Sequence, residues 1–427
     1  MLSNYLSVIK NRDFRFLWLA QITSQIALNM LSFVLAIIVY QATHSNTAVS
    51  LILLSFAVPS IIFGVVAGGI VDFYDKKVVL LLCNASRFIL LLGFFFFSQN
   101  ILILFILTIL VSIITQFFIP AEVPSIANLV TEKELLSANS LFTISFYLSM
   151  MMGFILAGPV VKLFGDKNAY LVMSSLLFIA TVFVYFLPSI KPQKSKSKVP
   201  ISFKFFTDTI EDGLRFINEN IRIKQSLILL TFSQALITTL AVLAPGFADK
   251  ILGIDLKDAS YLIMGPAAVG LVLGSFLVGA FGYKFLKGTI ILIGIIAVSV
   301  TLLLLSFISK AGRPSIGVYI YHLHSKFVIS NLSSAIFLLF FLGIFNSFIS
   351  VCANAILQED SNTQMRGRIY GVLTSLTGGV SLLPVVFSSI LADIVGVGRT
   401  LSVIGIAVLT VGVYHYLQRK TVNNIIR

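Results

Sequence analysis

The fold of this chain is decided by the stretch Gly68-Gly69-Ile70-Val71-Asp72-Phe73-Tyr74-Asp75-Lys76-Lys77, which lies between two long apolar runs. The run before it, residues 48–67, holds no charged residue, and the run after it, residues 78–97, holds only Arg87. Each run is long enough to cross a bilayer as a helix. Glycines let two helix ends approach closely because they carry no Cβ. The stretch therefore predicts a tight cytoplasmic loop between two membrane spans.

Composition identifies the class of protein. The chain has 427 residues, of which 58% are hydrophobic and 11% are charged. Soluble domains carry roughly a quarter charged residues, so these values indicate a polytopic membrane protein and exclude a large soluble domain. The two cysteines, Cys83 and Cys352, lie inside apolar runs. We expect them to be packing residues rather than a disulfide.

Twelve helix-length apolar segments follow one another, six before and six after a polar linker. They are residues 14–40, 48–71, 78–97, 101–119, 138–164, 169–187, 225–248, 259–281, 289–308, 332–357, 369–391 and 400–417. We predict an all-α polytopic membrane protein with twelve transmembrane helices in two six-helix halves. The expected parts are an N-terminal half at 1–190, a cytoplasmic linker at 191–224 and a C-terminal half at 225–427.

The linker is expected to contain an amphipathic helix. Its first part is rich in lysine and serine, and apolar residues then recur every three or four positions after residue 203. Such a pattern predicts a helix lying on the membrane surface. A plain connector helix packed on the bundle is the alternative.

The basic residues predict the orientation of the chain. If the N-terminus is cytoplasmic, the cytoplasmic segments carry the excess of lysine and arginine. The net charge of +13 then reflects topology and contact with anionic lipid headgroups, rather than binding of nucleic acid. We therefore expect a multi-pass protein in the inner or plasma membrane of a bacterium, with both termini cytoplasmic.

The decapeptide also resembles the loop between helices 2 and 3 of major facilitator superfamily transporters, whose pattern is G-x-x-x-D-R-x-G-R-K. Four residues match this pattern and two depart from it: Gly68, Asp72, Lys76 and Lys77 match, while Phe73 and Asp75 stand in place of an arginine and a glycine. The second half has only a degenerate counterpart at 279–284, which lacks the aspartate.

Four further segments resemble the macrolide-efflux-like and siderophore-export-like branch of this superfamily. They are residues 11–18, residues 117–124, the glycine and proline positions of 153–165, and residues 355–371. Together they extend across nearly the whole chain. The resemblance implies the twelve-helix fold of the superfamily, a small-molecule substrate, export, and a central cavity lined by helices 1, 4, 7 and 10.

Uncharged polar residues recur every four positions on three of those lining helices. They are Gln21, Gln25 and Asn29 on the first helix, Gln234 and Thr238 on the seventh, and Asn346, Ser350 and Asn354 on the tenth. This spacing places side chains on one helix face, and polar groups within a bilayer are costly unless they face protein or water. We predict a cavity that hydrogen-bonds a large, mostly neutral substrate. The alternative is that these amides and hydroxyls join neighbouring helices.

A second group of residues is expected to form an inner gate. Arg87 lies roughly ten residues into its span, about 15 Å deep at a rise of 1.5 Å per residue. A buried cation requires a partner, and Glu122 or Asp72 could reach it. We predict that Gly68, Asp72, Lys76, Arg87 and Glu122 form the gate, and that Glu122 or Asp72 carries the coupling proton. A static ion pair joining helices 2 to 4 is the alternative.

Helix 5 carries a predicted hinge, because Gly153, Gly158 and Pro159 permit bending and close helix contact. A purely packing role is the alternative. His322 and His324 form a His-x-His pair in a long outer loop, but no third ligand is adjacent. The sequence therefore predicts no metal site and no cofactor.

We expect a secondary active transporter that works as a monomer and exports amphiphilic small molecules (a drug, a siderophore or a lysolipid) in exchange for protons. Its partners would be the substrate, membrane lipids and protons. An enzyme is not expected, because the H-E-x-x-H, G-x-S-x-G and P-loop patterns are absent from the sequence. The alternatives are an importer or facilitator of another small solute, and a non-transporting membrane sensor on the same scaffold.

Overall fold

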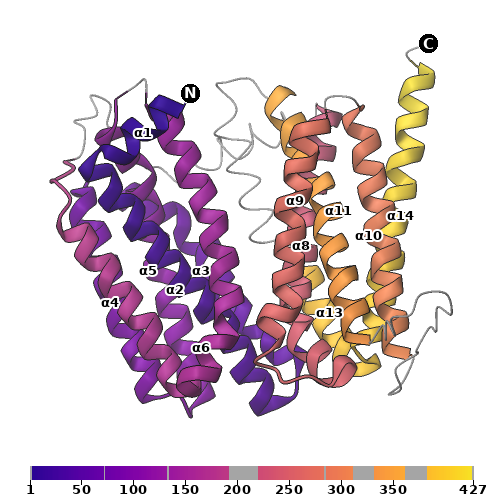
Figure 1. The fold of residues 1–427 in the computed structure, drawn as a ribbon, viewed down its shortest axis with the longest axis horizontal. Helices are drawn as coiled ribbons and strands as arrows, with labels where there is room; N and C mark the ends of the chain where they lie inside the picture. The colour runs from indigo at the N-terminus through magenta and orange to yellow at the C-terminus, as the bar shows by residue number, and fades with distance from the viewer. Residues whose placement is uncertain are drawn as a thin grey trace, which may run out of the picture. The chain divides into compact units, whose positions relative to one another are not determined.

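The computed structural model describes seven segments, and within them the chain forms helices joined by short turns (Figure 1). The segments are residues 2–71, 73–131, 134–191, 220–282, 285–310, 331–360 and 382–425. Asp72, His322, His324 and the expected amphipathic helix of the linker lie outside these residues. The prediction of an all-α membrane protein is confirmed.

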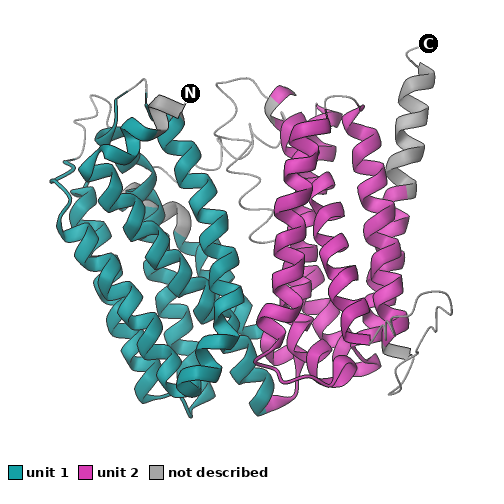
Figure 2. Ribbon diagram, viewed as in Figure 1, with its two compact units in different colours: residues 1–42, 51–205 teal, residues 43–50, 206–427 magenta. Residues whose placement is uncertain are grey.

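The helices fall into two compact units, which are coloured separately in Figure 2. Unit 1 comprises residues 1–42 and 51–205, and unit 2 comprises residues 43–50 and 206–427. The expected boundaries after residues 190 and 224 stay predictions. The first turn of α3 belongs to unit 2, whereas the rest of that helix belongs to unit 1.

The helix bounds are as follows. Those of the first part of the chain are α1 Leu2–Lys10, α2 Arg12–Thr43, α3 Asn46–Val71, α4 Lys76–Phe96, α5 Ile101–Leu129 and α6 Leu135–Tyr185. Those of the second part are α8 Ile221–Phe247, the π-helical turns η1 Ala248–Leu252 and η2 Ser260–Met264, then α9 Gly265–Phe281, α10 Lys287–Lys310, α11 Asn331–Asp360, α13 Leu382–Val395 and α14 Val397–Ile425.

Nine of the described helices are long and apolar enough to cross a membrane. The helix α6 contains two of the predicted spans and changes direction at Gly165, whose φ of 81° is a left-handed conformation that favours glycine. Shorter apolar helices at Leu382–Val395 and Val397–Thr410 correspond to the last two predicted spans. Residues 369–381 of the eleventh predicted span lie outside the described residues.

The distribution of buried and exposed side chains on α4 is typical of a membrane-spanning helix. Its buried face includes Leu80, Arg87 and Leu91, at intervals of seven and four residues that keep them on one side of the helix. Leu82 and Ile89 point away and are 59% and 63% exposed. A soluble helix would place its polar residue outside, whereas α4 buries a cation and presents leucine and isoleucine to its surroundings. That arrangement suits a hydrocarbon environment.

The turn between α3 and α4 is tied to the end of α6 by Asp75. This residue caps α4 by accepting a bond from the amide of Lys77 (2.9 Å), and it also accepts bonds from the Ile190 amide (3.0 Å) and the Ser189 hydroxyl. Partial burial alone would raise the pKa of Asp75, but these bonds hold it below its ordinary value. The aspartate that replaces the family's glycine thus serves as a structural cap.

In unit 2, α11 packs tightly against α9 through glycines. A Cβ on Gly274 would lie 2.1 Å from the Ser347 Oγ and 2.6 Å from the Ile344 carbonyl oxygen. A Cβ on Gly343 would lie 2.1 Å from the Ala267 carbonyl oxygen. The two backbones can approach this closely only because both sides of the seam carry glycine. A sequence signal for it existed, because Gly270 and Gly274 form a G-x-x-x-G pattern.

Candidate functional site

The deepest charged group described in unit 1 is the guanidinium of Arg87, which is fully buried on α4. Its Nη1 donates to the Asn84 Oδ1 (3.3 Å) on the same helix and to the Ser24 Oγ (3.4 Å) on α2. Its guanidinium carbon lies 4.4 Å from the centroid of the Phe118 ring on α5. Three helices therefore enclose the cation, and the aromatic face stabilises it through a cation–π contact.

Glu122 is the acidic residue that influences this cation electrostatically. It lies on α5 one helical turn after Phe118, is 6% exposed, and interacts electrostatically with Arg87. Prolines stand two residues before and two residues after it. Each proline lacks the N–H that would bond the carbonyl four residues earlier, so the α5 backbone around Glu122 has carbonyl groups without their helical donor. These carbonyls add polarity to the site.

Several polar atoms of this cluster have no hydrogen-bond partner. They are the Nε and Nη2 of Arg87, the Oε1 of Glu122, the Nδ2 of Asn84 and the Oε1 of Gln21. In Arg87 the two free nitrogens lie on the same edge of the guanidinium, which is the edge that matches a carboxylate in a bidentate pair. An unsatisfied buried polar atom costs about 1–3 kcal/mol, so the present arrangement leaves favourable bonds unmade. A rearrangement that forms these missing bonds would therefore be favourable.

The predicted gate residues have different places in the structure. Arg87 and Glu122 lie together, as the sequence analysis expected. Lys76 is buried, and its Nζ donates to the Val71 carbonyl (2.7 Å), where it caps the end of α3. Gly68 lies within α3, and Asp72 is outside the described residues. The gate function of this group stays a prediction.

The polar stripe on α2 is partly satisfied within unit 1. Gln21 is 2% exposed and donates to the Phe142 carbonyl on α6 (3.3 Å), so it joins two helices. Asn29 donates to the carbonyl of Gln25 (2.8 Å) and to its Oε1 (3.3 Å). These contacts agree with the helix-joining alternative at Gln21, whereas Gln25 and Asn29 bond mainly to one another.

The stripes of unit 2 show a similar mixture. Asn346 on α11 is buried and accepts a bond from Ser233 on α8 (3.0 Å), which joins these two helices. Thr238 and Ser350 donate to carbonyls of their own helices, and the Gln234 side chain is exposed. Asn354 is half-buried on α11. Whether the stripes of the two units face one cavity stays a prediction.

The predicted hinge of helix 5 contains a close helix contact. A Cβ on Gly153 would lie 2.7 Å from the Asn29 Cβ and 2.8 Å from the Ile26 carbonyl oxygen. This glycine is therefore required for α6 to pack against α2. Pro159 stands inside α6, and Gly158 is buried beside it. Bending at these positions stays a prediction.

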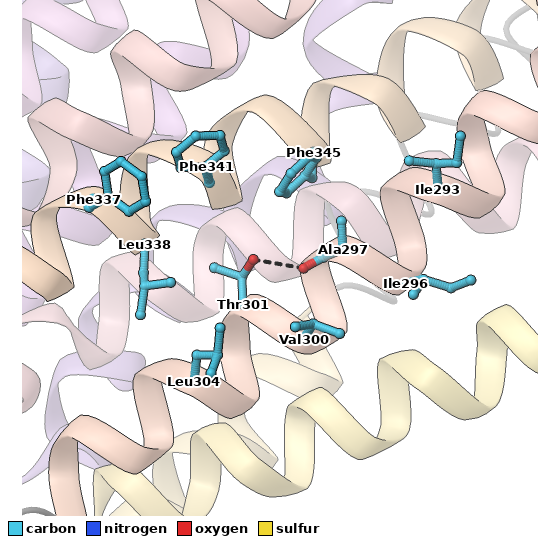
Figure 3. Close-up of a pocket in the computed structure, with 10 residues that line it drawn as sticks. All are labelled: Ile293, Ile296, Ala297, Val300, Thr301, Leu304, Phe337, Leu338, Phe341 and Phe345. Atoms are coloured by element: carbon cyan, nitrogen blue, oxygen red, sulfur yellow. Dashed lines mark hydrogen bonds between the residues drawn. The ribbon is translucent and has the colours of Figure 1, made fainter.

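A hollow of about 490 Å³ lies in unit 2 between α10 and α11 (Figure 3). Aliphatic and phenylalanine side chains line it, including Ile296, Val300 and Phe341. Thr301 is its one hydroxyl-bearing residue, and that hydroxyl donates to the Ala297 carbonyl of its own helix (2.7 Å; Figure 3). Because ligand sites use polar groups to orient their ligands, this hollow offers little selectivity. The Arg87 cluster is the better candidate for the functional site.

Two partners of the site were not predicted as such from the sequence. Asn84 precedes Arg87 by three residues and so shares its helix face, which is a signal the sequence contains. Phe118 lies in residues 117–124, one of the segments that resemble the superfamily, but the sequence alone does not show that its ring would cover the guanidinium. That contact depends on how α4 and α5 pack.

Comparison with protein families gives a match to the model of the Major Facilitator Superfamily over residues 17–384. Two bacterial transporters are similar in sequence. The MFS-type transporter YfiS of Bacillus subtilis (strain 168) is 23% identical over 397 residues, which cover 91% of this chain and 88% of YfiS. The staphyloferrin A transporter of Staphylococcus aureus (strain NCTC 8325 / PS 47) is 24% identical over 393 residues, which cover 88% of this chain and 90% of that transporter.

Solved structures with a similar fold are also transporters. The nucleoside transporter NupG has a TM-score of 0.72 at 11% identity, over 95% of this chain and 99% of NupG. A bacterial homologue of the human lysosomal transporter Spinster, in its inward-facing and unoccupied conformation, has a TM-score of 0.70 at 14% identity, over 96% of this chain and 97% of the homologue. At this identity the likeness concerns the fold alone.

Proposed function

Because the chain belongs to the major facilitator superfamily, we propose that it is a proton-coupled secondary transporter that exports amphiphilic small molecules by alternating access. The observation that carries the proposal is the buried pair of Arg87 and Glu122, enclosed by polar atoms that lack partners. A membrane protein buries opposite charges at a cost of several kcal/mol per ion, so such a pair marks a functional site more often than a stabilising one.

In this proposal Glu122 carries the proton. With Glu122 ionised, a movement that brings its carboxylate onto the free edge of the Arg87 guanidinium would satisfy both groups and cancel their charges. A proton that binds a carboxylate oxygen of Glu122 removes the negative charge, and Arg87 is left without its counter-ion. The protonated and ionised forms therefore favour different arrangements of α4 and α5, and a ligand that binds one form better shifts the population between them.

The same pair links the charge of the substrate to the direction of proton movement. A substrate that donates hydrogen bonds or carries positive charge competes with the proton for Glu122, which gives exchange. A substrate whose anionic group takes the free edge of Arg87 instead displaces Glu122 and favours its protonation, which gives co-transport. Export driven by proton entry thus requires a substrate with donor or cationic groups that face Glu122.

The substrate class rests on the relatives and on the polar stripes. The name of the staphyloferrin A transporter supports a siderophore among the candidates, together with a drug or a lysolipid. We propose that Gln25, Gln234 and Asn354 contribute hydrogen bonds to the substrate. Each belongs to a row of polar residues, spaced by four, on a helix that is predicted to line the cavity. The protein would act as a monomer in a bacterial cell membrane.

The test uses everted membrane vesicles with an imposed proton gradient. Macrolides, siderophores and lysolipids are added one at a time, and dissipation of the gradient is recorded. We expect at least one compound to release protons in the wild type and to release at least roughly tenfold less in Glu122→Gln, because the amide cannot exchange a proton. Glu134→Gln serves as the matched control, since Glu134 is a partly exposed acid in the turn before α6 and accepts bonds from the Ser7 and Thr131 hydroxyls.

Two outcomes would contradict the proposal. Proton release that is unchanged in Glu122→Gln would remove Glu122 as the proton carrier. Direct uptake of a compound without any proton movement would favour a facilitator or an importer coupled to another ion.

A further inference from the structure

The last turn of α13 carries a carboxylate, Asp393, whose two oxygens are hydrogen-bonded to residues at the start of α3. Asp393 accepts bonds through its Oδ1 from the amide of Asn46 (2.8 Å) and from the Asn46 Nδ2 (2.9 Å). Through its Oδ2 it accepts bonds from the amide of Thr47 (2.9 Å) and from the Ser45 hydroxyl (2.6 Å). Both oxygens of one side chain therefore bind the first turn of α3.

A second contact continues this seam one helical turn away. The Ser389 hydroxyl on α13 donates to the Ser50 hydroxyl on α3 (2.9 Å). Ser389 precedes Asp393 by four residues and Ser50 follows Asn46 by four, so the two pairs lie along the same faces. On its other side Asn46 meets α8, where a Cβ on Gly246 would lie only 2.3 Å from the Asn46 Oδ1. The first turn of α3 is thus seated between α13 and α8.

Electrostatics make this contact favourable only while the two helix ends meet. The C-terminal end of a helix carries a partial negative charge, so Asp393 is disfavoured by its own helix, which ends at Val395. The N-terminal end of α3 carries a partial positive charge and presents free amides. Asp393 therefore gains its stabilisation from α3, and it would lose that stabilisation if α3 moved away.

The helix that Asp393 holds is shared between the two compact units. Residues 43–50 group with unit 2, while α3 from residue 51 onward groups with unit 1. Within this segment, two residues before α3 begins, His44 has a φ of 51°, and it is the one non-glycine residue with positive φ in the described part of the chain. A left-handed conformation at such a residue costs of order 1–3 kcal/mol and persists only where the surroundings enforce it. The turn is therefore held under backbone strain.

We propose that Asp393 is a latch that holds the first turn of α3 on α13 in one state of the transport cycle and releases it in the other. The proposal rests on transport by alternating access, as proposed above. In this proposal Asp393 acts as a positioning residue that sets the balance between states. Ser389 with Ser50 forms the second rung of the latch.

The first test measures whether this contact opens, and it requires no substrate. Val49 is fully buried in the latched turn, so a Val49→Cys protein reconstituted in nanodiscs reports opening by its rate of reaction with a hydrophilic maleimide. The parent protein serves as the blank, because its own two cysteines are buried. We expect Asp393→Asn to raise the labelling rate of Val49→Cys roughly tenfold, since a charged acceptor becomes a neutral amide with only one acceptor oxygen.

The matched control is Asp255→Asn in the same Val49→Cys background. Asp255 also belongs to unit 2, but it accepts a bond from the Lys257 amide in the turn between η1 and η2 and does not contact α3. This control should leave the labelling rate unchanged. Equal labelling rates in Asp393→Asn and its parent would overturn the latch. A rate that rises equally in Asp255→Asn would also overturn it, because the effect would then be one of net charge.

The second test locks the latch. The Ser50 and Ser389 hydroxyl oxygens are 2.9 Å apart, so cysteines at both positions are within reach of a disulfide. In vesicles that show substrate-dependent proton release, we expect oxidation of Ser50→Cys/Ser389→Cys to abolish that release and reduction to restore it. Undiminished release in the oxidised protein would overturn the proposal. Faster labelling in Asp393→Asn without proton release for any compound would support the latch and contradict the proposed function.

Discussion

Unit 1 and unit 2 treat a buried or half-buried charge in opposite ways. In unit 1, Arg87 and Glu122 are both buried and each has polar atoms left without hydrogen bonds. In unit 2, both carboxylate oxygens of Asp393 are engaged by α3. In the first arrangement several hydrogen-bonding atoms have no partner, whereas in the second both carboxylate oxygens are hydrogen-bonded.

This difference indicates what role each charged group is expected to have. A group with unmade bonds responds to a proton or a ligand, because either one can complete them. A group with complete bonds defines one conformation and resists change until another interaction replaces it. We therefore assign chemical coupling to the Arg87 cluster and conformational control to Asp393. The predictions below test this comparison, from the largest expected effect to the smallest.

Removing one partner of the buried pair should have the largest effect on stability. We expect Arg87→Met to lower the free energy of unfolding by about 3–5 kcal/mol, because Glu122 is then buried without its counter-ion. The double variant Arg87→Met/Glu122→Gln should recover much of that loss, since no uncompensated charge remains. Thermal unfolding of detergent-purified protein measures both. A double variant as unstable as the single one would show that the pair contributes through shape rather than charge.

The glycine seam of unit 2 gives the next largest effect. We expect Gly274→Ala to lower the free energy of unfolding by about 1–3 kcal/mol, because its Cβ has no room beside Ser347 and Ile344. Gly279→Ala is the matched control on the same helix, since a Cβ there meets nothing within 4 Å. The control should be neutral or slightly stabilising, by up to about 1 kcal/mol. Equal losses in the two variants would mean that α9 loses stability through helix propensity and not through its contact with α11.

Asp393 should contribute a smaller amount to the stability of the latched state. We expect Asp393→Asn to lower the free energy of unfolding by about 1–2 kcal/mol, the range found for loss of a helix-capping side chain. Ser389→Ala should cost less, because it removes one hydroxyl bond. The same two variants should rank in the same order in the rate at which Val49→Cys is labelled. The reverse order would place the main contact of the latch at Ser389 and Ser50.

Asp75 should give the smallest and most pH-dependent effect. Its pKa is lowered in the folded protein, so the folded state is stabilised by its ionised form above its ordinary pKa, near 4. That contribution is lost as the pH falls through the lowered value. The difference in melting temperature between wild type and Asp75→Asn should therefore be present at pH 7, begin to shrink near pH 4, and be lost only below the lowered pKa of the folded state. A difference that persists at low pH would assign the effect to the shape of the cap.

Much of the fold was predictable because its cause is local. A bilayer forces every span to satisfy its own backbone in a helix, so apolar runs of about twenty residues could be placed without knowledge of their packing. The burial of Arg87 and its need for a carboxylate partner followed from the same reasoning, and the pairing with Glu122 stays a prediction. The break between the predicted spans 138–164 and 169–187 falls where α6 changes direction at Gly165, but only the structure shows that the chain turns there through a left-handed glycine.

The sequence by itself determined the class of protein, the order of its spans, the family it resembles and the few charges inside the membrane. These follow from hydrophobicity and spacing along one chain. Only the tertiary structure decided which groups meet: Phe118 over Arg87, the glycine seam between α9 and α11, and Asp393 at the start of α3. Asp393 and Asn46 are separated by 347 residues in the chain. A contact of that kind depends on the packing of helices, and no local pattern of residues encodes it.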